Sequence, residues 1–382
     1  MAYFDNAATT YPKPEIVYTA MDEFYRAFGA NAGRGGYGLA ISAKQTIEET
    51  RLLVKQVLHC QPKQVIFTPT ATIALNMIIQ GLIATGVRTV YISPFEHNAV
   101  TRVLHAFEKT GKIQTAQLYV TDDLKYDIER IRYQFEAKKP DLVIISHASN
   151  VFGLIAPIEE IFRLAKKYHS YTVADMSQTA GLVECNTGLS CFDFAVFAGH
   201  KTMYGPTGIS GFVMNPEVKL PPVLYGGTGV ESANLDMPEG LPERYEMGTL
   251  NISGIAGLNA ALKWNIKTGI RKIAETEKMH RDRLLSLLQE YTWIKPVGNY
   301  QDNEYVGIVS CIIDGVSSDS AGSIFSERGI AVRTGLQCAP LAHKFMGTFP
   351  AGTIRFSVSF FTSDMDYEEL ESALDYIDAE ID

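Results

Sequence analysis

The stretch "FDFAVFAGHK" (residues 192–201) sets the fold class, because a nearly continuous apolar run is typical of a strand buried on both faces of a sheet. Comparable short runs precede and follow it, with amphipathic helical stretches between them. They are "QVIFT", "RTVYIS", "DLVIIS", "YTVAD" and "GISGFVM". The alternation between about residues 16 and 215 predicts an α/β fold with a mainly parallel sheet that helices cover on both faces.

The pattern changes after residue 215. Residues 216–248 are rich in Gly and Pro and predict one long loop, which in a compact protein is usually functional. Further on, the sequence predicts a long helix over 273–291, strands near 305–313, 329–333 and 353–360, and an acidic helix that begins after Ser363. We therefore expect a large domain over 16–252 and a small α/β domain formed by 1–15 and 253–382.

The net charge and the lack of long apolar runs limit the classes of molecule that the protein is expected to bind. The chain has 382 residues and a formal net charge of −9, which argues against nucleic acid and anionic membranes as partners. No apolar run reaches the ~18 residues that a membrane span needs, and the N-terminal residues lack the pattern of a signal peptide. We therefore expect a cytoplasmic enzyme.

The five cysteines at positions 60, 185, 191, 311 and 338 are scattered. They form neither a disulfide framework nor the close CxxC pairs of a zinc site, so we expect no metal and a reducing compartment. Burial is the ordinary state of a free cysteine, and we expect it for four of the five. For Cys338, on a predicted loop, burial and a role as nucleophile both stay open at this point.

Polar residues follow the predicted strands where each strand ends, and ligands bind at that edge of an open α/β sheet. Each one alone has an ordinary explanation as a satisfied histidine, a surface lysine or a helix cap. Together they provide a helix start suited to phosphate, a carboxylate, an imidazole and a lysine, the set that pyridoxal phosphate requires. No GxGxxG follows the first strand, which disfavours a dinucleotide. The residues are "PTATIALN" (69–76), Glu96-His97-Asn98, His147 to Asn150, Asp175 with Gln178, and Gly199-His200-Lys201.

An ordered series of motifs over nearly the whole chain resembles the cysteine desulfurases of the class V aminotransferases. The motifs are "YFDNAATT", "EHNAV", "HASNVFG", "DMSQTAG", "FAGHK", "YGPTG", "MGTLN", "VRTGLQCAP" and "TIRFSVSFF". The resemblance implies fold type I of the pyridoxal phosphate enzymes, with a seven-stranded, mainly parallel sheet in the large domain. It also implies L-cysteine as substrate, a homodimer and a sulfur-acceptor protein. The short loop before the cysteine resembles that of the selenocysteine lyase-like group of this family.

The resemblance also implies a role for each matching residue. Lys201 would form the Schiff base with the cofactor, and Cys338 would be the nucleophile that takes sulfur from the substrate. His97 is the third residue that the resemblance implies to be catalytic. Arg355 and Asn150 would bind the substrate, because a bidentate guanidinium suits a carboxylate. The other cofactor contacts would be Asp175 at the ring nitrogen, Gln178 at the phenolic oxygen, His97 and Asn150 at the ring, Ala71, Thr72 and His200 at the phosphate, and Thr249 from a partner subunit.

Three positions depart from the family pattern. Ala198 and Ala71 lack hydroxyls that relatives use for the phosphate, and Leu336-Gln337 replaces a histidine pair before the nucleophile. The alternatives that stay open are a selenocysteine lyase on the same scaffold and a non-catalytic sulfur carrier or scaffold protein. A relative that acts on another amino acid also stays open, although such chemistry would not need Cys338.

Overall fold

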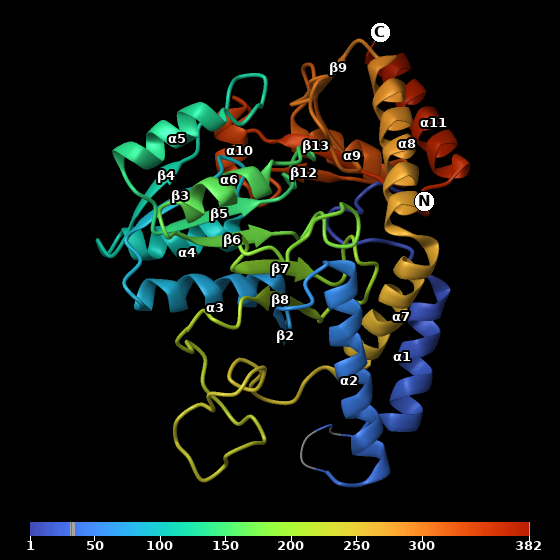
Figure 1. The fold of residues 1–382 in the computed structure, drawn as a ribbon. Coiled ribbons are helices and arrows are strands. Elements are labelled where there is room, and N and C mark those ends of the chain that lie inside the picture. The colour runs from blue at the N-terminus through green and yellow to red at the C-terminus, as the bar shows by residue number, and fades with distance from the viewer. Residues whose placement is uncertain (31, 33–34, 382) are drawn as a thin grey trace.

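The computed structural model describes residues 1–30, 32 and 35–381. A seven-stranded sheet forms the centre of the larger part of the molecule (Figure 1). Only β8 runs antiparallel to its neighbours, so the sheet is mainly parallel as predicted. In spatial order its strands are β2 (Gln64–Thr68), β8 (Ser210–Met214), β7 (Phe194–Ala198), β6 (Tyr171–Asp175), β5 (Leu142–Ser146), β3 (Thr89–Ile92) and β4 (Gln114–Gln117).

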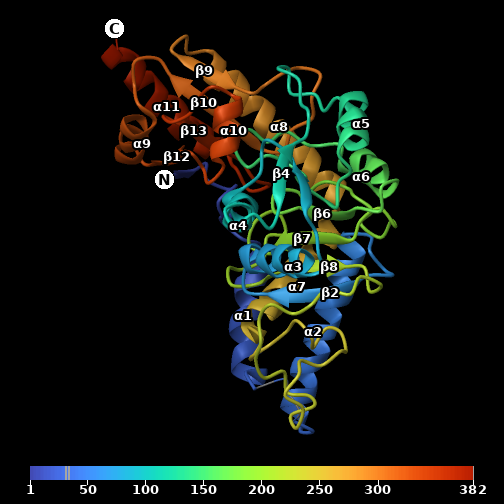
Figure 2. The same ribbon diagram turned by 90° about the vertical axis from the view of Figure 1, so that its left-hand side faces the viewer.

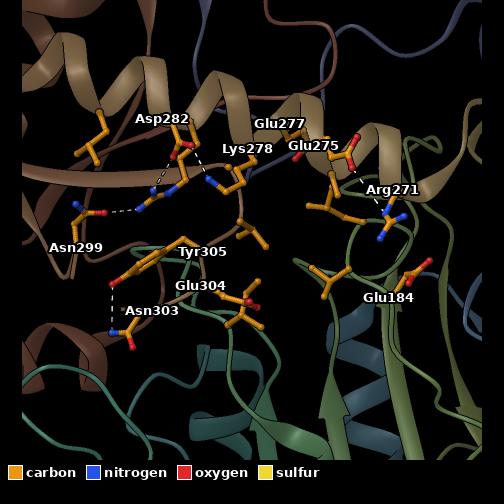
Figure 3. A pocket seen from close by; sticks show the side chains of 18 of the residues that line it. Glu184, Arg271, Glu275, Glu277, Lys278, Asp282, Asn299, Asn303, Glu304 and Tyr305 are labelled. Atoms are coloured by element: carbon orange, nitrogen blue, oxygen red, sulfur yellow. Dashed lines mark hydrogen bonds and ion pairs between the residues drawn. The ribbon is translucent and has the colours of Figure 1, made fainter. Parts of the chain in front are cut away.

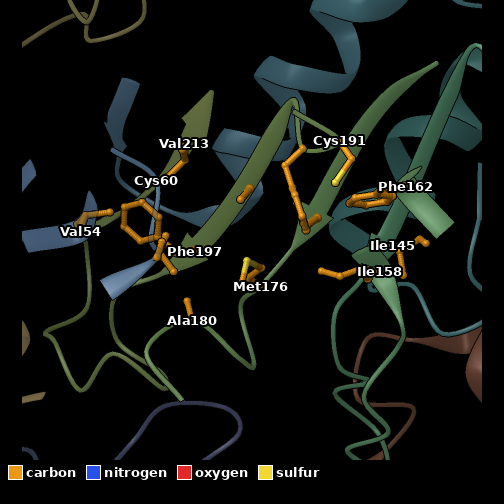
Figure 4. Packing of buried hydrophobic residues seen from close by; sticks show 14 of the residues in the cluster. Val54, Cys60, Ile145, Ile158, Phe162, Met176, Ala180, Cys191, Phe197 and Val213 are labelled. Carbon is orange, nitrogen blue, oxygen red and sulfur yellow. The ribbon is translucent and has the colours of Figure 1, made fainter. Parts of the chain in front are cut away.

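Helices cover both faces of this sheet, because the side chains of its central strands are buried on both sides. One face packs against α3 and α4, and the other against α2, α6 and α7. Phe197 and Met176 lie in the second of these cores, together with Phe162 of α6 (Figure 4). The helices of this part are α1 (Glu15–Phe28), α2 (Gly38–Val57), α3 (Ala71–Ala84), α4 (Asn98–Glu108), α5 (Ile128–Ala137), α6 (Ile158–Lys166) and α7 (Ile252–Thr268).

A smaller four-stranded antiparallel sheet lies at the other end of the molecule, as Figure 2 shows. Its strands, in spatial order, are β12 (Arg333–Gly335), β13 (Thr353–Ser357), β10 (Ile308–Ile313) and β9 (Ile294–Val297). The N-terminal strand β1 (Ala2–Tyr3) pairs in parallel with β11 (Ile330–Ala331), so the first residues join the C-terminal part. The helices here are α8 (Ile270–Gln289), α9 (Ser318–Glu327), α10 (Pro340–Phe345) and α11 (Asp364–Ile381).

The predicted division of the chain at 252/253 stays a prediction. Ile255, Leu258 and Leu262 of α7 belong to the core beside the large sheet, and this packing favours a division after that helix. The described residues 215–251 form neither helix nor strand, in agreement with the predicted loop.

Most predicted elements are present within a few residues. The structure adds β4 and β9, which the sequence did not indicate because "QTAQ" is polar and "IKPV" contains a proline. Ser363 caps α11 as predicted: its hydroxyl accepts from the Asp366 N–H at 3.3 Å, while the Asp366 carboxylate accepts from the Ser363 N–H at 2.8 Å. Among the described helices, none is long and apolar enough to cross a membrane.

Candidate active site

A cavity of about 220 Å³ lies at the carboxyl edge of the large sheet. Every cofactor contact predicted on that sheet lines it, while Thr249 does not and is instead exposed on the long loop. The carboxyl ends of neighbouring parallel strands meet at one edge, and this topology explains how residues far apart in the chain converge here. The predicted residues that line the cavity are Ala71, Thr72, His97, Asn150, Asp175, Gln178, His200 and Lys201.

Lys201 lies in the tight turn after β7, where the Gly205 N–H donates to the Gly199 carbonyl at 2.7 Å. The pKa of its amine is lowered to about 8, mainly by burial, and the positive charge of Arg355 acts in the same direction. The carboxylate of Asp175 acts in the opposite direction. A large share of the Lys201 amine is therefore neutral near pH 8, the form in which an amine attacks a carbonyl carbon.

Asp175 ends β6 and is 6% exposed. One of its carboxylate oxygens accepts from the Ser177 N–H at 3.0 Å and from the Ser177 hydroxyl at 2.6 Å. These bonds fix the carboxylate at the cavity wall. Gln178 is held in a similar way, since its side-chain amide donates to the Ala7 carbonyl at 2.9 Å.

The N-terminus of α3 forms one end of the cavity. The side chain of the N-cap Thr70 accepts from the Ile73 N–H, while the N–H groups of Ala71 and Thr72 lie in the first turn, where helices leave such donors unpaired. Within the described part of the chain, the buried Nδ1 of His200 also has no hydrogen-bond partner. These free donors and the helix dipole suit a phosphate, so the missing hydroxyls at 71 and 198 do not prevent a fit.

His97 is the N-cap of α4, and its Nδ1 accepts from the Ala99 N–H at 3.0 Å. Burial lowers the pKa of its imidazole, and the positive charge of Lys201 adds to this effect. The ring is therefore neutral at neutral pH, and His97 lines the cavity.

Arg355 comes from β13 of the small sheet and is 3% exposed. Its Nη1 donates to the Asn150 carbonyl at 2.8 Å, and its Nη2 donates to the Asp5 carboxylate at 2.8 Å. Ile354 and Phe356 point into the core of the small sheet, which confirms the predicted alternation. The alternative of a surface ion pair is wrong, because the guanidinium is buried.

Cys338 is exposed on the loop between β12 and α10. The side chain of Asn150, whose carbonyl accepts from Arg355, donates to the carbonyl of the preceding Gln337 at 2.6 Å. The carbonyl of Cys338 accepts from the Asn98 N–H at 2.7 Å, directly beside His97. The loop from the small sheet therefore contacts the edge of the large sheet.

The other four cysteines differ from Cys338 in burial. Cys60, Cys191 and Cys311 are buried as predicted, whereas Cys185 is only partly buried. Burial raises the pKa of the thiols of all four, to about 11 for Cys60 and to about 12 for Cys185 and Cys311. None of the four is a better candidate for a thiolate nucleophile.

A second hollow of about 600 Å³ lies between α8 and the loop before β10 (Figure 3). None of the predicted site residues lines it. Several of its charged side chains have local partners: Lys278 pairs with Asp282 at 2.7 Å, and Arg281 donates to Asn299 at 2.6 Å and covers the Tyr305 ring. This hollow therefore lacks the convergent reactive groups found at the sheet edge.

The sequence did not identify Asp5 or Ser177 as supports of the site. Asp5 belongs to the quoted "YFDNAATT" motif, and Ser177 to "DMSQTAG". A buried substrate-binding arginine commonly needs a carboxylate partner, and this requirement is the signal that could have pointed to Asp5. The two residues lie 350 positions apart in the sequence, so no local pattern indicates that they pair.

The fold and site define a class: α/β enzymes that place a lysine, a carboxylate and an anion-binding helix start at one sheet edge, opposite an arginine from a smaller sheet. The family described as Aminotransferase class-V matches residues 2–370. The chain belongs to this family.

Relatives and solved structures agree with this assignment. A probable cysteine desulfurase of Pyrococcus abyssi is 32% identical, with 97% of this chain and 92% of the relative covered. A cysteine desulfurase of Haloferax volcanii is 28% identical, with 99% and 89% covered. The structure is similar to that of a cysteine desulfurase from Thermococcus onnurineus, with a TM-score of 0.90, 29% identity, and 99% and 95% of the two chains covered.

Proposed function

We propose that the protein is a pyridoxal phosphate-dependent cysteine desulfurase. It would convert L-cysteine to L-alanine and transfer the sulfur to Cys338 as a persulfide, from which an acceptor protein would take it. One observation carries this proposal: Asn150, which lines the cavity together with Lys201, accepts from Arg355 through its carbonyl and donates to the carbonyl of Gln337, the residue before Cys338. The names of the relatives support the choice of substrate.

The cavity residues would hold the cofactor. Lys201 would bind its aldehyde carbon, Asp175 would face its ring nitrogen and Gln178 its phenolic oxygen. The phosphate would lie at the start of α3, near the unpaired Nδ1 of His200. When bound, pyridoxal phosphate withdraws electrons from the Cα of an amino acid.

The residues of the chain would then supply the remaining steps. Arg355 holds the substrate carboxylate, and the Lys201 amine moves the proton at Cα. The Cys338 thiolate attacks the substrate sulfur, so that an S–S bond forms while the substrate Cβ–S bond breaks. The electron pair of the broken bond stays with Cβ, which takes up a proton and becomes the methyl group of alanine.

We also propose a homodimer in which Thr249 contacts the cofactor of the partner subunit. The support is the long loop that carries Thr249, which extends away from the main body (Figure 1). This loop exposes the large apolar side chains of Tyr225 and Leu235, with exposed fractions of 73% and 102%. Exposed apolar side chains on one segment are typical of an interaction site.

The proposed compartment is the cytoplasm. All five cysteines are free, and an exposed thiol such as that of Cys338 stays available as a nucleophile only where thiols are kept reduced. The physiological acceptor would have to reach Cys338 from solvent, which its exposure permits.

The test is to incubate the purified holoenzyme with L-cysteine and measure alanine and sulfide in the presence of a reductant. We expect equal amounts of both, and we expect Cys338→Ala to lose both while it keeps the visible absorbance of the bound cofactor. Selenocysteine in a parallel assay separates the two substrates: a much larger kcat/KM for selenocysteine would replace the proposed desulfurase by a lyase. Colourless protein that forms no alanine would support the non-catalytic alternative.

A further inference from the structure

The backbone of the cysteine loop is unusual at two consecutive positions. Gln337 has φ +39° and Cys338 has φ +59°, both in the left-handed region that residues other than glycine rarely adopt. Such a conformation persists only where the surroundings determine it, and strained residues of this kind cluster at functional sites.

The side chain of Gln337 explains how the conformation is held. Gln337 is 5% exposed, and its amide nitrogen donates to the Thr353 carbonyl at 2.9 Å. Its amide oxygen lies 2.9 Å from Nε2 of the fully buried His343, whose Nδ1 lies 2.8 Å from the Thr348 hydroxyl. This series of hydrogen bonds, from Thr348 through His343 to Gln337 and on to Thr353, connects the residue before the cysteine to α10 and β13.

The main chain of the same two residues is bound to the cofactor side of the site. The Asn150 side chain donates to the Gln337 carbonyl at 2.6 Å, and the Asn98 N–H donates to the Cys338 carbonyl at 2.7 Å. The loop is therefore fixed by hydrogen bonds from both sheets at once.

We propose that Gln337 and His343, supported by Thr348, are positioning residues that hold Cys338 in its left-handed conformation and so direct its thiol to the substrate. In this protein Leu336-Gln337 replaces the histidine pair that relatives have before the nucleophile, so Gln337 would position Cys338 in a different way. This inference rests on the proposed function for its catalytic consequence, while the fixed backbone rests on the contacts alone.

The experiment uses two variants. Gln337→Met fills a similar volume but removes the side-chain hydrogen bonds of Gln337. Thr348→Val, at a half-buried position, removes only the hydrogen bond between Thr348 and His343. Lys344→Ala is the control, because Lys344 lies on the same helix and is exposed. Two rates are measured on the holoenzymes: persulfide formation in a single turnover with L-cysteine, and alkylation of Cys338 by iodoacetamide without cysteine, followed by mass spectrometry.

We expect Gln337→Met to slow persulfide formation about ten- to hundred-fold, because small misplacements of a reacting group have effects of this size. KM for cysteine and the cofactor absorbance should stay within about twofold of the unaltered protein. Alkylation of Cys338 should become about threefold faster or more, because a released thiol samples more orientations. Thr348→Val should change both rates in the same direction but less, and the double variant should resemble Gln337→Met.

Unchanged alkylation in both variants would overturn the proposal, whatever the activity. Unchanged persulfide formation in Gln337→Met would overturn it as well, provided that the unaltered enzyme is active. If the unaltered protein forms no alanine but alkylation rises as expected, the proposed function fails while the positioning of Cys338 by these residues is supported.

Discussion

The two sides of the candidate site are built by different means. On the large sheet, Asp175 and Lys201 follow directly from strand ends, and the parallel topology brings them together. On the small sheet, Arg355 and Cys338 do not line the cavity but are connected to its wall by hydrogen bonds with Asn150 and Asn98, respectively. The first side is positioned by the sheet itself, and the second by a few hydrogen bonds between the two sheets.

Asn150 is the residue at which the two sides meet. Its carbonyl accepts from Arg355, and its side chain donates to the Gln337 carbonyl. One loop after β5 therefore holds both the predicted substrate arginine and the cysteine loop. The comparison teaches that loss of a reacting group, Lys201 or Cys338, should remove the chemistry, whereas loss of a contact that positions the small-sheet side should reduce its efficiency by degrees.

The largest effect should follow from Lys201→Ala, which removes the reactive amine of the large-sheet side. We expect desulfuration to fall by more than about ten-thousand-fold, because covalent and proton-transfer roles are lost together. Alanine formation measures this, with Lys167→Ala, an exposed lysine that follows α6, as the control. If Lys201→Ala kept more than a tenth of the original activity, the chemistry would not depend on the Lys201 amine and the comparison would fail.

Arg355→Lys tests the small-sheet side. Lysine cannot make both contacts of the guanidinium or grip a carboxylate with two bonds, so kcat/KM for L-cysteine should fall about ten- to hundred-fold, mainly through KM. The matched control is Arg333→Lys, an exposed arginine that pairs with position 355 across β12 and β13. Equal losses in the two variants would contradict a specific role for Arg355.

Asn150→Ala tests the connection between the sides. Loss of the bond to the Gln337 carbonyl should lower kcat about three- to tenfold, because one hydrogen bond is removed without loss of a reacting group. Steady-state kinetics with L-cysteine measure the change. An effect as large as that of Lys201→Ala would mean that Asn150 takes part in the chemistry itself.

The smallest effect concerns pH. The neutral fraction of the Lys201 amine grows as pH rises through its pKa of about 8, so capture of pyridoxal phosphate by the cofactor-free protein should speed up through that pH and then level off. An ordinary lysine would continue to gain rate up to about pH 10. Asp175→Asn removes a charge that raises the Lys201 pKa, so the midpoint should move to lower pH. Stopped-flow absorbance follows the capture, and a rate still climbing at about pH 10 would contradict the assignment.

Much of the large-sheet side could be predicted from the sequence. Apolar runs such as residues 194–198 mark the strands, and the polar residue after each run marks the shared edge. The phase of β13 also placed Arg355 opposite Ile354 and Phe356. These signals are local, so they can be read without knowledge of the fold.

The connection between the sheets could not be predicted in this way. The bond between Asn150 and Gln337 joins residues 187 positions apart, and that between Arg355 and Asn150 joins residues 205 positions apart. No periodicity reports such contacts, because they depend on how the two sheets are arranged. The left-handed backbone at Gln337 and Cys338 was missed for the same reason: neither is a glycine, and the conformation depends on distant partners.

The most direct test of the account is a single turnover of the holoenzyme with isotopically labelled L-cysteine, followed by peptide mapping. If the lysine and the loop thiol act on one amino acid, one labelled sulfur should appear on the Cys338 peptide for each alanine formed, with none on the other four cysteines. Alanine without label on Cys338, or undiminished alanine from Cys338→Ala, would contradict the account.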